Sequence, residues 1–314
     1  MSAKRPPPVG ALLGTAALLL ATTQPALAFG LEEEVTRFPR GKPITFVVNM
    51  ANAPSTLSQE QVVDVARKAL APWTRIATAQ LPLTLGSVIN DPAKTSPQPD
   101  GTNVIFWEAS FTPRGDMFAG KAYPFGAECD ILLQPRAPFT LIDVQAILLH
   151  EVGHCLGLKH SAAPGVMTKF QGLPSLGQDD MVGVSVLHPH HSVSLTRKTA
   201  TIKGRLLRGA KPLLGAVLRA VDRKTRRISV AGFSGLIDNQ RRVDPSGRFE
   251  LPGLPPGDYE LSVEPMDAFV SADPAGYGAP VKTPPEPFKP FAVELPSLEA
   301  GDAYDVATLD VEDR

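Results

Sequence analysis

Apolar and polar positions alternate differently in the two halves of this 314-residue chain. Over residues 58–78 apolar side chains recur every three or four positions, which predicts an amphipathic helix that Ser58 and Gln61 would cap. A further helix is expected over residues 177–187. Shorter apolar runs predict strands over residues 42–50, 81–88, 103–111, 117–125 and 129–134. The first half therefore combines helices and strands.

From residue 199 onward short strand-like runs alternate with turn residues. Strands are expected over residues 200–206, 212–221 and 232–238, with closing strands within 291–312. Residues 244–261 alternate turn glycines and prolines with strand residues, which predicts a hairpin. Seven prolines within residues 265–290 predict a long loop or wrapping arm. The pattern indicates an α+β domain followed by an all-β domain.

One more helix is expected after Thr140, which forms a capping box with Asp143 ahead of an apolar stretch. This helix leads into the run from His150 to His160, which reads H-E-x-x-H-x-x-G-x-x-H. Three of the six histidines of the chain fall within these eleven residues. The run has the spacing of a zinc site that carries its own general base.

The spacing has a physical reason. His150 and His154 are four residues apart, so they share one face of a helix and can point at one metal ion. Gly157 tolerates the left-handed conformation that would turn the chain and bring in His160 as the third ligand. Three neutral imidazoles leave zinc one open position. Glu151 would take a proton from water and pass it to the leaving amine. The alternative is a buried helix whose histidines are satisfied without a metal.

The run resembles the metzincin zinc proteases, which have a methionine turn beneath the metal. Met167 matches that methionine, and Ser161 and residues 178–184 are similar to the matrixin branch and its bacterial relatives. The resemblance implies a catalytic domain over residues 29–190, built from a twisted mixed sheet and three helices, that binds one zinc ion. Thr168 stands where many relatives have tyrosine, so no catalytic tyrosine is expected there.

The resemblance also implies two structural features. It places the strand that holds Cys129 beside the helix that holds Cys155, so a disulfide between them is expected, with two buried free thiols as the alternative. It assigns residues 117–125 to the sheet edge along the cleft, where an extended substrate would add as a strand. The alternative is an ordinary edge strand.

The second half has its own resemblance, carried by residues 244–261. They are similar to the hairpin of carboxypeptidase-regulatory-like and transthyretin-like β-sandwiches, which implies a sandwich of residues 199–314 in a structural or binding role. The basic run 223–227 would contact an anionic extracellular or cell-surface ligand, or form a solvated turn. The histidine cluster 188–191 would bind metal, or be exposed before a linker over residues 191–198.

The N-terminus has the pattern of a secretion signal. Lys4 and Arg5 precede an apolar stretch over residues 9–21, and small residues at 26–28 suit cleavage. We therefore expect residues 1–28 to be removed and the protein to be secreted, or periplasmic in a double-membrane bacterium. An uncleaved anchor is the alternative, and no stable membrane anchor is expected.

Composition adds little to this hypothesis. A net charge of −1 gives no reason to expect a nucleic-acid partner. The leading hypothesis is a secreted zinc endopeptidase that cleaves proteins or peptides. The competing one is an extracellular adhesion protein whose β-sandwich binds the ligand and whose metal site is vestigial.

Overall fold

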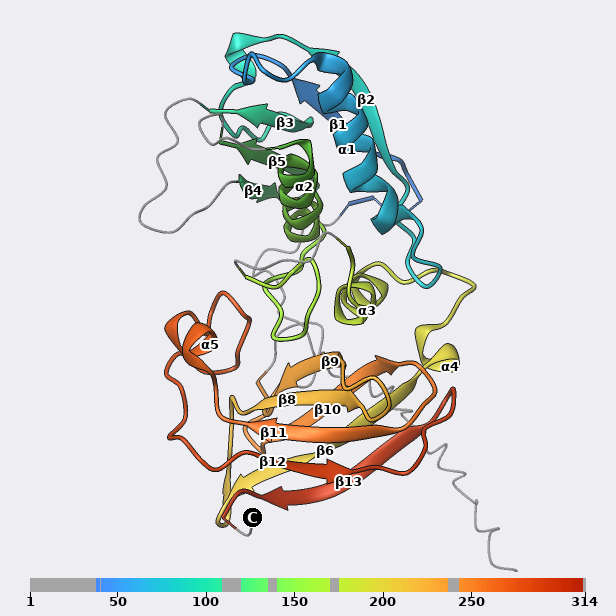
Figure 1. Cartoon of the computed structure of the whole chain (residues 1–314), viewed down its shortest axis with the longest axis vertical. Helices are drawn as coiled ribbons and strands as arrows, with labels where there is room; N and C mark the ends of the chain where they lie inside the picture. Colours follow the sequence, from blue (N-terminus) through green and yellow to red (C-terminus); the bar gives the residue numbers. More distant parts are fainter. Residues whose placement is uncertain are drawn as a thin grey trace, which may run out of the picture.

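The chain forms an α+β unit and a β-sandwich, which follow one another along the long axis of the molecule (Figure 1). The computed structural model describes residues 38–39, 41–108, 120–134, 140–169, 175–236 and 243–312. The expected secretion signal lies outside these ranges, as do residues 109–111, 117–119 and 237–238 of three expected strands. Within them, no helix has the length and apolar character to cross a membrane.

The first unit contains a five-stranded mixed sheet. Its strands are β1 (Ile44–Asn49), β2 (Leu83–Ile89), β3 (Asn103–Trp107), β4 (Gly120–Phe125) and β5 (Glu128–Leu133). The order is β2-β1-β3-β5-β4, and only β4 runs antiparallel to its neighbour. The five predicted strands are confirmed within the described residues, and β4 is an edge strand as expected.

Three helices belong to this unit, namely α1 (Gln59–Thr74), α2 (Leu141–Cys155) and α3 (Gln178–Leu187). The predicted capping boxes are present at Ser58 and at Thr140. Helix α1 ends four residues earlier than predicted, where Arg75 N donates to Pro72 O at 3.2 Å in a tighter final turn. Trp73 Nε1 donates to Leu149 O at 3.1 Å and so joins α1 to α2.

The predicted disulfide is present. Cys129 on β5 and Cys155 at the end of α2 are bonded, with their Cα atoms 5.5 Å apart. Both residues are fully buried in the core that the sheet shares with α1 and α2. The bond therefore connects the helix of the histidine motif directly to the sheet.

The second unit is a sandwich of two four-stranded sheets, reached through the short helix α4 (Leu195–Lys198). One sheet contains β6 (Ala200–Arg208), β7 (Lys211–Pro212), β10 (Arg248–Leu254) and β13 (Ala303–Asp310). The other contains β8 (Val217–Asp222), β9 (Ile228–Phe233), β11 (Tyr259–Glu264) and β12 (Phe291–Glu294). Apolar residues of both sheets are buried in one common core.

Two predictions for this unit are wrong. Residues 244–261 do not form a hairpin, because β10 pairs with β6 in one sheet while β11 pairs with β8 and β12 in the other. The chain crosses between sheets there, and the Tyr259 hydroxyl donates to Pro255 O at 2.9 Å across the turn. The strand expected over 232–238 begins earlier, at Ile228, and ends before Gly235, whose φ of 83° belongs to a turn.

The interpretation of residues 188–191 as exposed is wrong for His188 and His190, which are half-buried. Gln80 N donates to His188 O at 2.8 Å, and His190 N donates to Thr78 O at 3.0 Å. These hydrogen bonds connect residues 188–190 to the segment that follows α1. The expected linker over residues 191–198 contains α4.

The basic run over residues 223–227 lies in the turn between β8 and β9, as predicted. Arg226 pairs with Glu260 at 2.8 Å, and Arg223 pairs with Glu294 at 3.4 Å. Both partners belong to the same sandwich, which favours the interpretation of this run as a solvated turn.

Candidate active site

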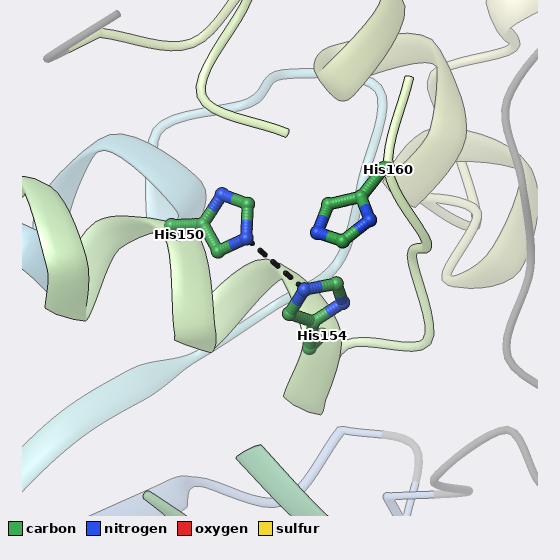
Figure 2. Close-up of side chains that lie close together, drawn as sticks. All are labelled: His150, His154 and His160. Atoms are coloured by element: carbon green, nitrogen blue, oxygen red, sulfur yellow. Dashed lines mark hydrogen bonds between the residues drawn. The ribbon is translucent and has the colours of Figure 1, made fainter. Parts of the chain in front are cut away.

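The three histidines of the motif meet at the end of α2 (Figure 2). His150 and His154 lie one helical turn apart, and their Nε2 atoms are 3.1 Å from each other. Gly157 has a φ of 96°, so the chain reverses there as predicted and brings His160 toward the same point. One ring nitrogen from each histidine lies within 4.8 Å of the others.

Hydrogen bonds determine which ring nitrogens carry protons. His150 Nδ1 lies 2.6 Å from Val166 O, and His154 Nδ1 lies 2.7 Å from Leu158 O. A carbonyl oxygen only accepts, so both Nδ1 atoms must donate, and in neutral rings both Nε2 atoms then present lone pairs. Two lone pairs that face each other at 3.1 Å repel unless a cation lies between them.

The distances fit a zinc ion. Nitrogens about 2.1 Å from a tetrahedral ion lie about 3.4 Å apart, close to the observed Nε2 separation. Burial, with the nearby charge of His154, lowers the pKa of His150 to about 3. Burial also lowers the pKa of His160 to about 2, with smaller contributions from the other two histidines. Both rings are therefore neutral at neutral pH, the form that binds a metal.

Glu151 lies one residue after His150 and is 7 % exposed. The edge strand begins directly beside it, since a side-chain carbon added at Gly120 would lie 3.2 Å from Glu151 Oε1 and 2.6 Å from Ile147. The absence of a side chain at Gly120 thus allows β4 to approach the histidine helix. The Glu151 carboxylate and the start of the edge strand therefore lie next to each other.

Met167, which the metzincin resemblance expects beneath the metal, is 1 % exposed and packs against α2. The chain comes close to the helix at Gly153, where an added side-chain carbon would lie 2.2 Å from Met167 Sδ and 3.1 Å from the Trp73 ring. Gly153 occupies a variable position of the motif, yet this contact leaves no room for a larger residue.

Two buried aspartates that sequence reasoning missed hold the segment after His160. Asp180 accepts hydrogen bonds from the backbone N–H groups of Val166, Met167 and Gly177, at 2.7 to 3.2 Å. Asp179 accepts a bond from Ser161 Oγ at 2.5 Å and another from Ala231 N, on β9, at 3.1 Å. The only sequence signal was the resemblance of residues 178–184 to matrixins.

Thr168 follows the methionine and closes the turn. Its hydroxyl donates to Ala163 O at 3.0 Å and accepts from Gly165 N at 3.1 Å. The side chain that replaces the relatives' tyrosine is therefore engaged with the backbone of the turn.

Sequence reasoning also missed a contact from the second unit. The aromatic ring of Tyr277 lies against the imidazole of His160, with ring centroids 5.7 Å apart. Nothing in the proline-rich pattern around residue 277 indicated such a position.

A mixed sheet, three helices, a histidine triad and a buried methionine turn together define a metzincin domain. Residues 37–189 match the family model of the matrixins. This part of the chain is therefore a matrixin-like domain, and matrixins are zinc metalloproteases.

Other comparisons add little. One solved structure that matches is metalloproteinase-II from Bacteroides fragilis, with 14 % sequence identity and a TM-score of 0.33. The match covers 53 % of the present chain and 59 % of the Bacteroides chain. The present chain is 17 % identical to the major pilin subunit of Bacillus cereus, with a TM-score of 0.21, over 36 % of this chain and 30 % of that one. At these scores neither likeness extends the family assignment. No curated protein matches the chain.

Proposed function

We propose that the protein is an exported zinc endopeptidase in which His150, His154 and His160 hold the ion and Glu151 is the general base. The observation that carries the proposal is the 3.1 Å distance between the Nε2 atoms of His150 and His154, whose lone pairs face each other. Their orientation is held by carbonyl oxygens on the opposite side of each ring. Such backing by backbone carbonyls is typical of histidines that bind metal.

A bound zinc ion would supply Lewis acidity, which acidifies water and polarises the peptide carbonyl. Glu151 would accept the proton of the attacking water and later donate it to the nitrogen of the leaving amine. Its position one residue past His150 turns its side chain about 100° away from that ligand. The carboxylate can therefore act beside the ion without joining its ligands.

The edge strand β4 supports an extended polypeptide as the substrate. Strand β4 is the last strand of the sheet and pairs with β5 along one of its edges. A peptide that adds to this edge would gain backbone hydrogen bonds. Because Gly120 begins β4 beside Glu151, that peptide would pass the carboxylate.

Two observations support export. Residues 1–28 have the charged, apolar and small-residue order of a secretion signal. The two cysteines of the chain form a buried disulfide, which is typical of oxidising compartments. Detection of the processed protein in culture medium or periplasm, beginning near Phe29, is the expected result. Retention of the full-length chain in the cytoplasm would contradict export.

The catalytic proposal is tested with Glu151→Gln in the full chain, using Glu60→Gln as the control because Glu60 is exposed on α1. We expect the Glu151 variant to bind about one zinc ion per chain and to cleave denatured protein at least about a hundredfold more slowly. The control should match the wild type. Unchanged cleavage by the Glu151 variant, or a wild-type chain that binds no zinc, would refute the mechanism.

A further inference from the structure

The three histidines differ in what holds the ring nitrogen that faces away from the shared point. His150 and His154 each use that nitrogen to donate to a backbone carbonyl of the first unit. His160 Nδ1 is buried and has no hydrogen-bond partner among the described residues. Metal-binding histidines are usually oriented by such a partner, so another contact must orient the His160 ring.

That contact comes from the second unit, more than a hundred residues later. Within the proline-rich segment, a turn over residues 273–277 follows the short helix α5 (Ala268–Ala272). His160 N donates to Gly276 O at 3.1 Å. The Tyr277 ring, 4 % exposed, lies against the imidazole at a tilt of 55°. Backbone and side chain of His160 are both held by this turn.

The turn is anchored on both sides of His160. Lys159 Nζ donates to Ala275 O at 2.8 Å, and Lys169 Nζ pairs with Asp273 Oδ2 at 2.8 Å. The other oxygen of Asp273 accepts from Gly276 N at 3.0 Å. Asp273 thus shapes the turn while Lys169, just after the methionine turn, fixes its place.

Tyr277 is in turn supported by the sandwich. It packs in an apolar cluster of the second unit made by Val217, Phe233, Met266 and Val270. Ala162, two residues after His160, packs against the same cluster, and Arg219 Nε of β8 donates to Ala162 O at 3.4 Å. The segment that follows His160 is therefore packed against the β-sandwich.

We propose that Tyr277, with the turn over residues 273–277, is the positioning element of the third metal ligand. The second domain thus completes the metal site and is more than an appended binding module. The inference rests on the proposed role of His160. Packing of the Tyr277 ring limits rotation of the imidazole, as hydrogen bonds do for His150 and His154. The Tyr277 ring orders the His160 imidazole before the zinc ion binds, so removal of the Tyr277 ring should weaken zinc binding.

The test is zinc affinity of the full chain, measured by competition with a chromogenic chelator. Tyr277→Ala removes the ring, whereas Tyr277→Phe keeps it and serves as the matched control. We expect the alanine variant to bind zinc about tenfold more weakly and the phenylalanine variant to stay within about twofold of the wild type. The ligand-field spectrum of the Co²⁺-loaded alanine variant should also change.

A second background separates positioning from general structural damage. In His160→Ala, the substitution Tyr277→Ala should cause no further loss of zinc affinity, because the ligand on which Tyr277 acts is gone. If Tyr277→Ala lowered zinc affinity equally in the wild-type and His160→Ala backgrounds, or left it unchanged in the wild-type background, the inference would be overturned. The proposed function would not be affected by either result. A wild-type chain that binds no zinc would overturn the proposed function and the inference with it.

If Tyr277→Ala does not fold, Lys169→Met tests the same element from its outer anchor. Lys68→Met is its control, since it removes the exposed Lys68–Asp64 pair of α1, which lies at 2.6 Å. The Lys169 variant should bind zinc at least about threefold more weakly, and the control should not. Equal zinc affinities of the two variants would overturn the proposal.

Discussion

Gly153 and Met167 are in contact such that a side-chain carbon at position 153 would lie 2.2 Å from the Met167 sulfur. The contact lies beneath the turn of α2 that ends in His154. It links the helix that supplies two histidines to the turn that follows the third. Close packing at this point makes the shape of the site sensitive to a single methyl group.

Gly153→Ala should destabilise the protein, although alanine is the better helix former. The clash with Met167 and Trp73 should lower the free energy of unfolding by about 1–3 kcal/mol, measured by chemical denaturation. The double variant Gly153→Ala, Met167→Ala should lose less stability than the sum of the losses of the two single variants, because alanine at position 167 leaves room for the new methyl group. Strict additivity, or a more stable Gly153→Ala protein, would contradict the contact.

Asp179 should couple the two units. Its carboxylate accepts from Ser161 in the first and from Ala231 N in the second, and it is 1 % exposed. Asp179→Ala leaves both donors buried without a partner, which should cost about 2–4 kcal/mol of stability. Calorimetry should then show unfolding at a lower temperature, with a separate transition for each unit. An unchanged single transition would argue against the coupling.

The disulfide should contribute most of its effect through the unfolded chain. Cys129 and Cys155 are 26 residues apart, so opening this loop should lower stability by about 3.5 kcal/mol. The double variant Cys129→Ala, Cys155→Ala should show this loss without reductant, and dithiothreitol should affect only the wild type. The chain has no other cysteine, which makes the control specific. Equal stability of the two proteins would show that the bond contributes nothing.

Asp130 should make stability depend on pH. Burial raises its pKa to about 6, against the hydrogen bonds from Gln98 N and Val104 N that lower it. Since the unfolded carboxyl titrates near 4, the folded state holds the extra proton between about pH 4 and 6. The wild type should therefore lose up to about 3 kcal/mol relative to Asp130→Asn as the pH rises from 4 to 7.

Asp100→Asn is the control for this comparison. The hydrogen bond from Lys94 lowers the pKa of Asp100 from its ordinary value, the opposite direction to Asp130. Its stability difference from the wild type should stay nearly constant between pH 4 and 7. Denaturation curves at several pH values measure both variants, and a flat difference for Asp130→Asn would refute its raised pKa.

Local features of the chain were predictable where they depend on neighbours in sequence. Ser58 and Thr140 begin their helices as predicted, because a capping box involves residues only three positions apart. Sequence did not reveal that β10 and β11 belong to different sheets, since apolar alternation identifies a strand but not its partner.

The same distinction holds within the site. The spacing of the motif was enough to predict that His150 and His154 share a helix face and that Gly157 turns the chain toward His160, because these relations follow from helix geometry and backbone freedom. The contacts that orient these ligands come from long-range packing and could not be predicted. The Val166 carbonyl behind His150 and the Tyr277 ring against His160 are brought there by packing between segments far apart in the chain, and local periodicity carries no record of such contacts.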